Sequence, residues 1–233
     1  MSGAADGQRR GVLDRDRVVA TAIELVEADG LNALSMRRLG AAMGVEAMAL
    51  YRYVDGREDL LEAVVEEVTS KVERAADMDI GPHGGWQAYL QRVAHTVRDL
   101  AFAHPQVFPL VATRHPAAPW LRPPLRNLDV VEDFLATLSA AGFSEDQAVT
   151  AYRAFTSFLL GQLLLTVTQR GAQATTEEVI DEGDASVTHS DISAEEFPTI
   201  TRLRAKLSVD HSDEEFEEAL EQLLRRIDAL VSQ

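Results

Sequence analysis

The sequence contains no cysteine, few aromatic residues and no long apolar run. Without cysteine the chain cannot form a disulfide bond, a thiolate metal site or a cysteine nucleophile. No apolar run approaches the roughly 18 residues that a membrane span requires, and the N-terminal segment lacks the apolar stretch of a secretory signal. We therefore expect a cytoplasmic protein, and 233 residues are enough to bury a sizeable core.

Basic residues are too few to balance the acidic ones, and the net charge is −16. Taken over the whole chain, this charge argues against nucleic acid as a partner, because phosphate binding needs cations. The distribution is uneven, however. Up to Arg57, eight arginines balance eight acidic residues, so the whole surplus of negative charge lies further along the chain. A neutral N-terminal part and an acidic remainder are expected of a two-part regulator.

Strand signals are scarce, whereas apolar residues recur at helical spacing throughout, which predicts an all-α fold. Ser35 is expected to cap one short helix and Gly44 to end it. Three capping boxes mark further helix starts, at Asp55 with Glu58, Ser144 with Gln147 and Ser212 with Glu215. The predicted helices cover residues 16–29, 35–43, 46–54, 86–103, 125–141, 144–170, 195–207 and 213–231, with a connector helix from about residue 58 and one short helix after Pro105. Residues 171–193 are acidic and rich in Ser, Thr and Ala, and we expect a mobile loop there.

Residues 35–54 have the pattern of a helix-turn-helix, which lays its second helix in the DNA major groove. Gly40, Ala41 and Ala42 would let the two helices cross closely, and Gly44 permits the sharp turn between them. Helix pairs with small residues at their crossing are common in proteins of other kinds. The spacing alone therefore does not decide between DNA binding and an ordinary helix pair.

The segment LSMRRLGAAMGVEAMALYRYVDGREDLL, residues 34–61, resembles the N-terminal DNA-binding domain of the TetR transcriptional repressors. Three later segments, residues 142–144, 158–161 and 216–231, more weakly resemble the regulatory domain of the tetracycline-repressor branch. The resemblance implies an N-terminal three-helix helix-turn-helix domain plus a larger helical domain for ligand binding and dimerisation. We expect a flexible arm over residues 1–13, the DNA-binding domain over 14–60 and the ligand-binding and dimerisation domain over 61–233.

The resemblance also implies which side chains contact DNA. Arg37 would read a guanine edge or hold a phosphate. Residues at the start of the recognition helix would touch base edges or thymine methyls, and others would bind phosphate, with Ser35 and Arg52 as secondary candidates. The base-contacting set is Ala47, Met48 and Ala49, and the phosphate-binding set is Tyr51, Tyr53 and Arg57. In the alternative interpretation, Arg37 and Arg52 are solvated surface arginines and Tyr51 is a core aromatic residue.

In the regulatory part, the resemblance implies a small-molecule effector and a homodimer, for which we expect two sets of residues. The ligand-binding candidates are Trp86, Phe102, Phe108, Trp120, Phe155 and Phe158, each of which could instead be ordinary core. The dimer-interface candidates are Tyr152, Phe155, Leu159, Leu163, Phe216, Leu220, Leu223, Leu224 and Ile227. Leu110 stands where the tetracycline-repressor branch has a metal-binding histidine, so we expect no metal and no other cofactor.

No nucleophile elbow, phosphate loop or carboxylate pair is evident, and we expect no enzymatic activity. The leading prediction is a homodimeric repressor that binds a palindromic operator and is released by a small molecule. The alternative is a helical protein that binds a small molecule or another protein without sequence-specific DNA binding. The acidic net charge favours this alternative, and the helix-turn-helix favours the repressor.

Overall fold

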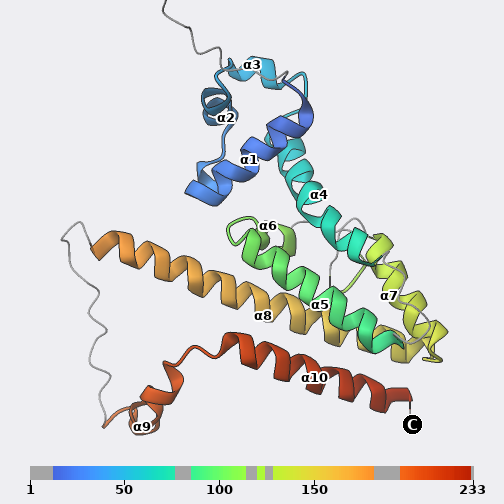
Figure 1. The fold of residues 1–233 in the computed structure, drawn as a ribbon. Helices are drawn as coiled ribbons and strands as arrows, with labels where there is room; N and C mark the ends of the chain where they lie inside the picture. The colour runs from blue at the N-terminus through green and yellow to red at the C-terminus, as the bar shows by residue number, and fades with distance from the viewer. Residues whose placement is uncertain (1–12, 77–84, 114–119, 124–127, 181–194, 232–233) are drawn as a thin grey trace, which may run out of the picture. The chain divides into compact units, whose positions relative to one another are not determined.

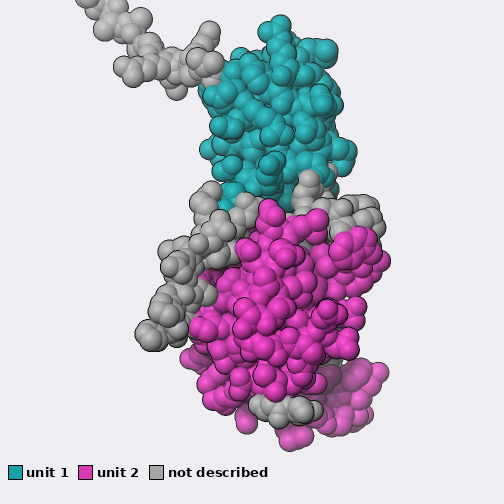
Figure 2. Space-filling view, turned by 90° about the vertical axis from the view of Figure 1, so that its right-hand side faces the viewer, with its two compact units in different colours: residues 1–71 teal, residues 72–233 magenta. Residues whose placement is uncertain are grey.

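The computed structural model describes residues 13–76, 85–113, 120–123, 128–180 and 195–231, and these ranges contain helices and no strand. The prediction of an all-α fold is thus confirmed. The chain divides into two compact units, unit 1 over residues 1–71 and unit 2 over residues 72–233 (Figure 2). The domain boundaries predicted after residues 13 and 60 stay predictions, and the predicted arm lies outside the described residues apart from its last residue.

Unit 1 contains three helices, a short 3-10 turn and the start of a fourth helix (Figure 1). The elements are α1 (Arg15–Asp29), η1 (Leu31–Ala33), α2 (Met36–Met43), α3 (Ala47–Leu50) and α4 (Arg57–Ala76). Asp14 caps α1 by accepting the N–H of Arg17 at 2.8 Å, and Gly30 ends it with a φ of 78°. The core of this unit is aliphatic, consisting of Val18, Val19, Ala22, Val26, Leu34, Leu39, Leu50, Val54, Leu60, Leu61, Ala63, Val64, Val65 and Val68.

Three predictions for unit 1 need correction. The third helix is shorter than expected, because residues 51–53 form a turn after α3. Ala41 and Ala42, predicted to lie at the close helix crossing with Gly40, are exposed. At the start of α4, the N–H of Asp55 donates to the carboxylate of Asp59 at 2.9 Å, so Asp59 closes the capping box that was predicted for Glu58. Both acids are at positions where a side chain can reach back over the first turn, and sequence spacing does not separate them.

Unit 2 is organised around one long helix. Its helices are α5 (Gly85–Ala103), α6 (Phe108–Thr113), α7 (Leu128–Ala140), α8 (Glu145–Ile180), α9 (Pro198–Leu207) and α10 (Ser212–Val231). Helix α8 contacts α5, α6, α7 and α10, which lie along it in Figure 1. Its first 25 residues are long and apolar enough on average to cross a membrane by length and composition alone. A core helix that packs against several neighbours, as α8 does, can have the same composition.

The ends of the last helices differ from the predictions. Helix α8 continues to Ile180, so the expected loop is wrong for residues 171–180, and residues 181–194 lie outside the described ranges. Ala, Gln and Glu in this stretch favour helix and outweigh its glycine and threonines. The Ser144–Gln147 capping box is confirmed by hydrogen bonds of 2.8 and 3.3 Å. Ser212, by contrast, is already helical, and its N–H donates to Asp210 at 2.9 Å.

Candidate nucleic-acid interface

The crossing of α2 and α3 is closed by Gly40. A Cβ at this position would lie 2.9 Å from the carbonyl oxygen of Val45 and 3.2 Å from the backbone nitrogen of Ala47. Gly44 adopts the left-handed conformation at φ 69°, and the next N–H, that of Val45, donates to Gly40 at 2.9 Å. These contacts form the tight turn of a helix-turn-helix, so the close crossing predicted at Gly40 is confirmed.

Several of the predicted DNA-contacting side chains are exposed on this module. Met48 is 75% exposed and Tyr51 is 46% exposed, and Arg37 and Arg52 are also exposed. Tyr51 is therefore not the core aromatic residue of the alternative interpretation. Ala47, Ala49 and Tyr53 are half-buried. Arg37, Arg52 and the Tyr51 hydroxyl are thus accessible for contacts with phosphates. The flexible apolar side chain of Met48 is accessible for contacts with thymine methyls.

Ser35 and Arg57 already have partners within unit 1. The Ser35 hydroxyl accepts the N–H of Arg38 at 3.2 Å and so caps α2, as predicted. The guanidinium of Arg57 donates from Nε to the carbonyl of Leu34 at 3.3 Å and from Nη2 to that of Leu31 at 3.4 Å. Arg57 thus connects the start of α4 to the turn before α2. Its phosphate contact stays a prediction, and that contact would have to use its other donor groups.

Two ion pairs that join different helices of unit 1 were not predicted. Arg38 lies 2.6 Å from the carboxylate of Asp29, and Arg15 lies 3.5 Å from that of Asp59. Each pair joins residues of different helices, so no helical spacing in the sequence could have indicated it. The Arg38 pair partly neutralises the charge next to Arg37, which makes Arg37 the stronger candidate for a contact with DNA.

Among the described residues of unit 2, the predicted ligand-binding aromatics have different surroundings. Phe108 and Phe155 are buried, and Trp86 packs edge-on against Phe143 with ring centroids 5.3 Å apart. Burial is compatible with a core residue and with a residue of an enclosed ligand site, so their contact with a ligand stays a prediction. Trp120 is 78% exposed. The described residues contain no group of three or more His, Asp or Glu side chains that could hold a metal ion.

Phe102 of α5 and Phe158 of α8 belong to a cluster around Arg98 and Phe216. The guanidinium of Arg98 lies 5.3 Å from the ring centroid of Phe102 and 5.1 Å from that of Phe216, while Phe158 stacks on Phe216 at 6.0 Å. Arg98 also pairs with two acids of α10, Asp213 at 2.7 Å and Glu217 at 3.1 Å. The Arg98 side chain is only 19% exposed, so this cluster fastens α10 to α5.

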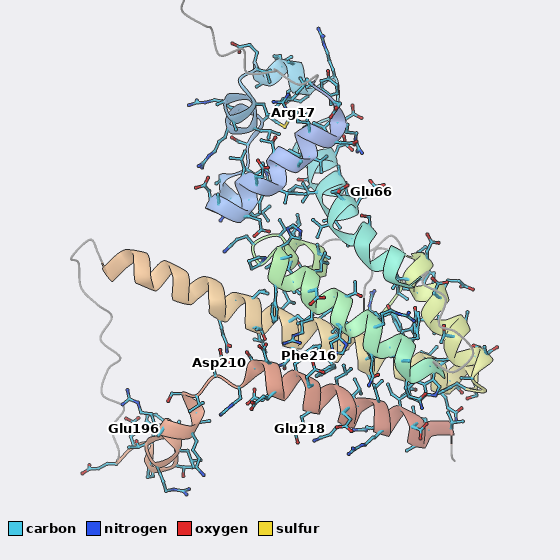
Figure 3. The ribbon with its side chains drawn as sticks, in the orientation of Figure 1. Arg17, Glu66, Glu196, Asp210, Phe216 and Glu218 are labelled. Carbon is cyan, nitrogen blue, oxygen red and sulfur yellow. The ribbon has the colours of Figure 1, made fainter. Side chains whose placement is uncertain are left out.

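The predicted dimer-interface residues lie mainly inside the single chain. All of them except the half-buried Leu223 are buried, and the rings of Tyr152 and Phe155 pack against Phe134 of α7. In Figure 3, Phe216 projects from α10 toward α8 and Glu218 projects away from it. The hydroxyl of Tyr152 donates to the carbonyl of Pro123 at 3.0 Å, and burial raises the pKa of Tyr152 to about 12. Side chains buried in this way offer little surface to a second copy, so a dimer would have to use neighbouring residues. Leucines at helical spacing on α8 and α10 do not distinguish a core from an interface.

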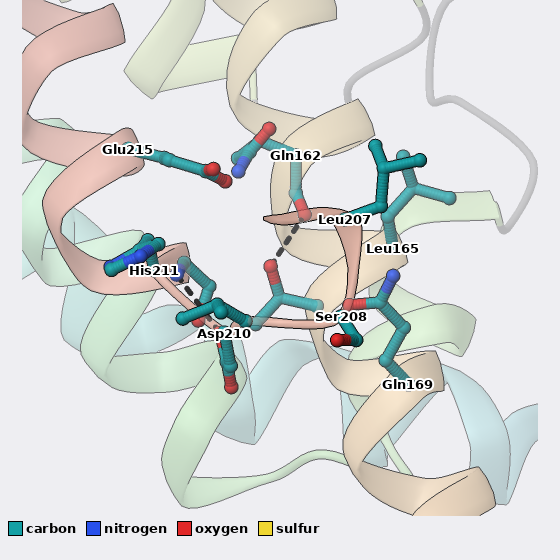
Figure 4. A pocket seen from close by; sticks show the side chains of 11 residues that line it. Gln162, Leu165, Gln169, Leu207, Ser208, Asp210, His211 and Glu215 are labelled. Carbon is teal, nitrogen blue, oxygen red and sulfur yellow. Dashed lines mark hydrogen bonds between the residues drawn. The ribbon is translucent and has the colours of Figure 1, made fainter. Parts of the chain in front are cut away.

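The second unit has a cavity elsewhere, between α8 and the segment that joins α9 to α10 (Figure 4). Its volume is about 600 Å³. None of the aromatic residues predicted for ligand binding lines it. The lining residues come from two parts of the chain far apart in sequence, which is why no motif indicated the cavity. They are Gln162, Leu165, Thr166, Gln169, Leu207, Ser208, Val209, Asp210, His211, Ser212 and Glu215.

The all-helical architecture and the N-terminal helix-turn-helix define a two-part regulator, and comparison with known families agrees. Residues 18–64 match the model of the bacterial regulatory proteins of the tetR family, and residues 81–231 match the tetracyclin repressor-like C-terminal domain. The chain belongs to the TetR family. The two matched ranges lie in both units. They include the four segments, residues 34–61, 142–144, 158–161 and 216–231, in which the sequence resembles this family.

Individual relatives agree with this assignment. The HTH-type transcriptional repressor DrrR1 of Streptomyces coeruleorubidus is 32% identical over 164 residues, which cover 70% of this chain and 57% of that repressor. The tetracycline repressor protein class C of Escherichia coli is 29% identical, with 71% of this chain and 70% of the relative covered. A crystal structure of a possible TetR family transcriptional regulator from Streptomyces coelicolor A3(2) is 28% identical with a TM-score of 0.70, and the match covers 93% of this chain and 100% of that one.

Proposed function

We propose that the protein is a transcriptional repressor that acts in the cytoplasm, binds a palindromic operator as a homodimer and is released by a small-molecule effector. The observation that carries the proposal is the helix-turn-helix closed by Gly40, with Arg37, Met48 and Tyr51 exposed on it. The names of two relatives, a transcriptional repressor and a tetracycline repressor, support repression and a small-molecule effector.

The outer faces of α8 and α10 support the dimer. Ala154, Ser157 and Gly161 are exposed on α8 at helical spacing, and a Cβ added at Gly161 would meet nothing within 4 Å. On α10, Leu223 and Leu230 are half-buried beside the core stripe. Small residues let helices of two copies approach closely, and the half-buried leucines offer apolar area to bury. A four-helix interface would form from these faces without disturbing the core.

The DNA-binding part is tested by fluorescence anisotropy on the DNA upstream of the protein's own coding region, titrated with salt. Arg37→Ala should weaken specific binding by about tenfold or more, because one arginine contact with a guanine is worth about 1–3 kcal/mol. Arg225→Ala is the matched control, since it removes the same charge from α10, where Arg225 pairs with Glu221. The proposal would be contradicted if both variants lost the same affinity for this DNA, or if the wild-type protein showed no specific binding at moderate salt.

The dimer is tested separately by sedimentation velocity at micromolar concentration. Gly161→Trp should convert the dimer to a monomer while leaving the helical circular dichroism unchanged, because its side chain would occupy open space in the single chain. Ala140→Trp places the same bulk on the exposed surface of α7 and should leave the dimer intact. A wild-type protein that sediments as a monomer would refute this part of the proposal.

A further inference from the structure

Helix α10 already contacts the rest of the chain along two of its sides. Its buried stripe faces α8, where Phe216 stacks on Phe158. One flank of the stripe faces α5, where Glu217 pairs with Arg98 at 3.1 Å. Glu215 precedes Phe216 and Glu217 follows it, and successive helical residues are about 100° apart, so Glu215 lies on the other flank. A partner from outside the chain can contact α10 along this other flank.

The other flank is apolar in its middle and charged at both ends. Ala219 and Leu223 are half-buried and lie one turn apart. Glu215 lies one turn before them and Arg226 about one turn after them, and both charged side chains are exposed. About three turns separate the two charges, so they project to the same side of the helix. We call residues 215, 219, 223 and 226 the outer strip of α10.

The charges of α10 are divided between its two halves. Residues 212–221 contain six acidic residues and no basic one, whereas residues 222–231 contain Arg225 and Arg226 against Asp228. A parallel neighbour with the same sequence would place acidic half against acidic half. An antiparallel neighbour would place each acidic half beside the basic half of the other copy. The charge pattern therefore favours an antiparallel neighbour.

The outer strip is complementary to itself about a two-fold axis between Ala219 and Leu223. Such an axis is the commonest symmetry of homo-oligomers, and it brings the same surface of both copies together. In this arrangement Glu215 of each copy meets Arg226 of the partner subunit. The small side chain of Ala219 lies opposite Leu223 of the partner subunit, so that a large apolar side chain has room between the helices.

Helix α8 leaves space for a second copy beside the outer strip. Ala154 follows by seven residues Gln147, which donates to the carbonyl of Leu230, and precedes by four Phe158, which stacks on Phe216. These spacings place Ala154 on the side of α8 next to α10, at a level between Leu230 and Phe216. Ala154 is exposed. Its small side chain lets another helix approach at the level of the middle of the strip.

We propose that α10 pairs antiparallel with α10 of a second copy along the outer strip, and that Glu215 and Arg226 of the partner subunit select this pairing. The inference rests on the proposed homodimer and adds the orientation of its helices and the residues by which a copy selects its own kind. Exposed ion pairs contribute little to affinity. The ion pair acts through selection, because like charges placed opposite each other disfavour a wrong partner.

Two charge reversals in the full chain test this pairing. In its homodimer, Glu215→Arg places arginine opposite arginine, and Arg226→Glu places acid opposite acid, so each variant should dimerise more weakly than the wild type. In a mixed dimer of the two variants, each reversed residue meets the opposite charge. Native mass spectrometry, after both variants are refolded together from urea, should find the ratio of mixed dimers to homodimers roughly tenfold above the statistical ratio.

Glu218→Arg and Arg225→Glu are the matched control pair, since they make the same changes of charge at exposed positions of α10 outside the strip. Refolded together, they should form mixed dimers in the statistical ratio. The proposal would be overturned if Glu215→Arg and Arg226→Glu also mixed in the statistical ratio. Equal enrichment in the control pair would overturn it too, because the attraction would then belong to the net charge of the chains.

The double variant Glu215→Arg/Arg226→Glu tests the pairing in one chain. Its charges are exchanged, so it should dimerise like the wild type, with unchanged helical circular dichroism, and should form few mixed dimers with the wild type. Statistical mixing with the wild type would overturn the antiparallel pairing and leave the homodimer standing. A wild-type chain that sediments as a monomer would overturn the homodimer and this pairing together, so the two failures are distinguishable.

Discussion

The two units differ in how their candidate sites are built. In unit 1 the candidate site is a continuous stretch of about twenty residues, and its geometry depends on backbone contacts between neighbours such as Gly40 and Val45. In unit 2 the cavity lies between residues 162–169 of α8 and a segment that begins at Leu207. A local motif can therefore be predicted from the amino-acid sequence. A cavity between segments that are distant in sequence is found only in the three-dimensional structure.

The units also differ in what their aromatic residues do. Tyr51 in unit 1 is exposed where a partner can reach it. Phe155 and Phe216 in unit 2 are buried, and the cavity is lined by amides, carboxylates and aliphatic side chains instead. The buried aromatic residues of unit 2 thus contribute to its core, and their contact with a ligand stays a prediction. The following predictions test this contrast, beginning with the largest expected effect.

Truncating an aromatic core residue of unit 2 should cause the largest loss of stability. Phe216→Ala removes a side chain that is 2% exposed and stacks on Phe158, and it leaves a hole beside Arg98. The free energy of unfolding should fall by about 3–5 kcal/mol. Urea denaturation followed by circular dichroism measures this change. Glu218→Ala on the exposed side of α10 is the control, and a similar loss there would contradict the core assignment of Phe216.

Adding a side chain at the helix crossing of unit 1 should have the next largest effect. In Gly40→Val the new Cβ would press against the backbone at 2.9 Å, which no rotamer can relieve. We expect a loss of about 1–3 kcal/mol in the stability of unit 1 and loss of DNA binding. Proteolysis within residues 14–60 should become faster while unit 2 remains protected. Ala41→Val, at an exposed position of the same helix, should show neither change.

Alkaline pH should destabilise unit 2 through Tyr152. The folded-state pKa is raised to about 12 by burial from the ordinary value of 10.0. The folded state therefore binds the phenolic proton more tightly, and stability is constant below pH 10 and falls as the pH rises through 12. The loss should reach about 1.4 kcal/mol at pH 11. Tyr152→Phe should flatten this part of the pH profile in chemical denaturation, and an unchanged slope would show that Tyr152 does not contribute.

The exposed ion pair of unit 1 should have the smallest effect. Asp29→Asn breaks the 2.6 Å pair with Arg38, in which both side chains are 40% or more exposed. The expected loss is about 0.5 kcal/mol, and it should disappear at high salt. Thermal denaturation at two salt concentrations measures it, with Glu24→Gln on the exposed side of α1 as the control. A larger loss that persists in salt would mean that Asp29 has a structural role beyond the pair.

Most of the fold could be predicted from the sequence, because capping residues and helical periodicity are local signals. Ser35, Gly44 and the Ser144–Gln147 box are where they were expected. The end of α8 was missed because a glycine and several threonines resemble a loop even where the helix continues. For the site, the helix-turn-helix was predicted in position, but its ion pairs were not. Those pairs depend on which surfaces of separate helices meet, and the sequence pattern does not contain that information.

Helix α8 contributes to three separate features of unit 2. It fills the core, it carries the small residues proposed to meet a second copy, and its Gln162, Leu165 and Gln169 line the cavity. A substitution on α8 therefore changes several properties together, and few changes there can be neutral. Residues 207–212, by contrast, are exposed or half-buried. Substitutions in this segment can therefore change the lining of the cavity without altering the core of the unit.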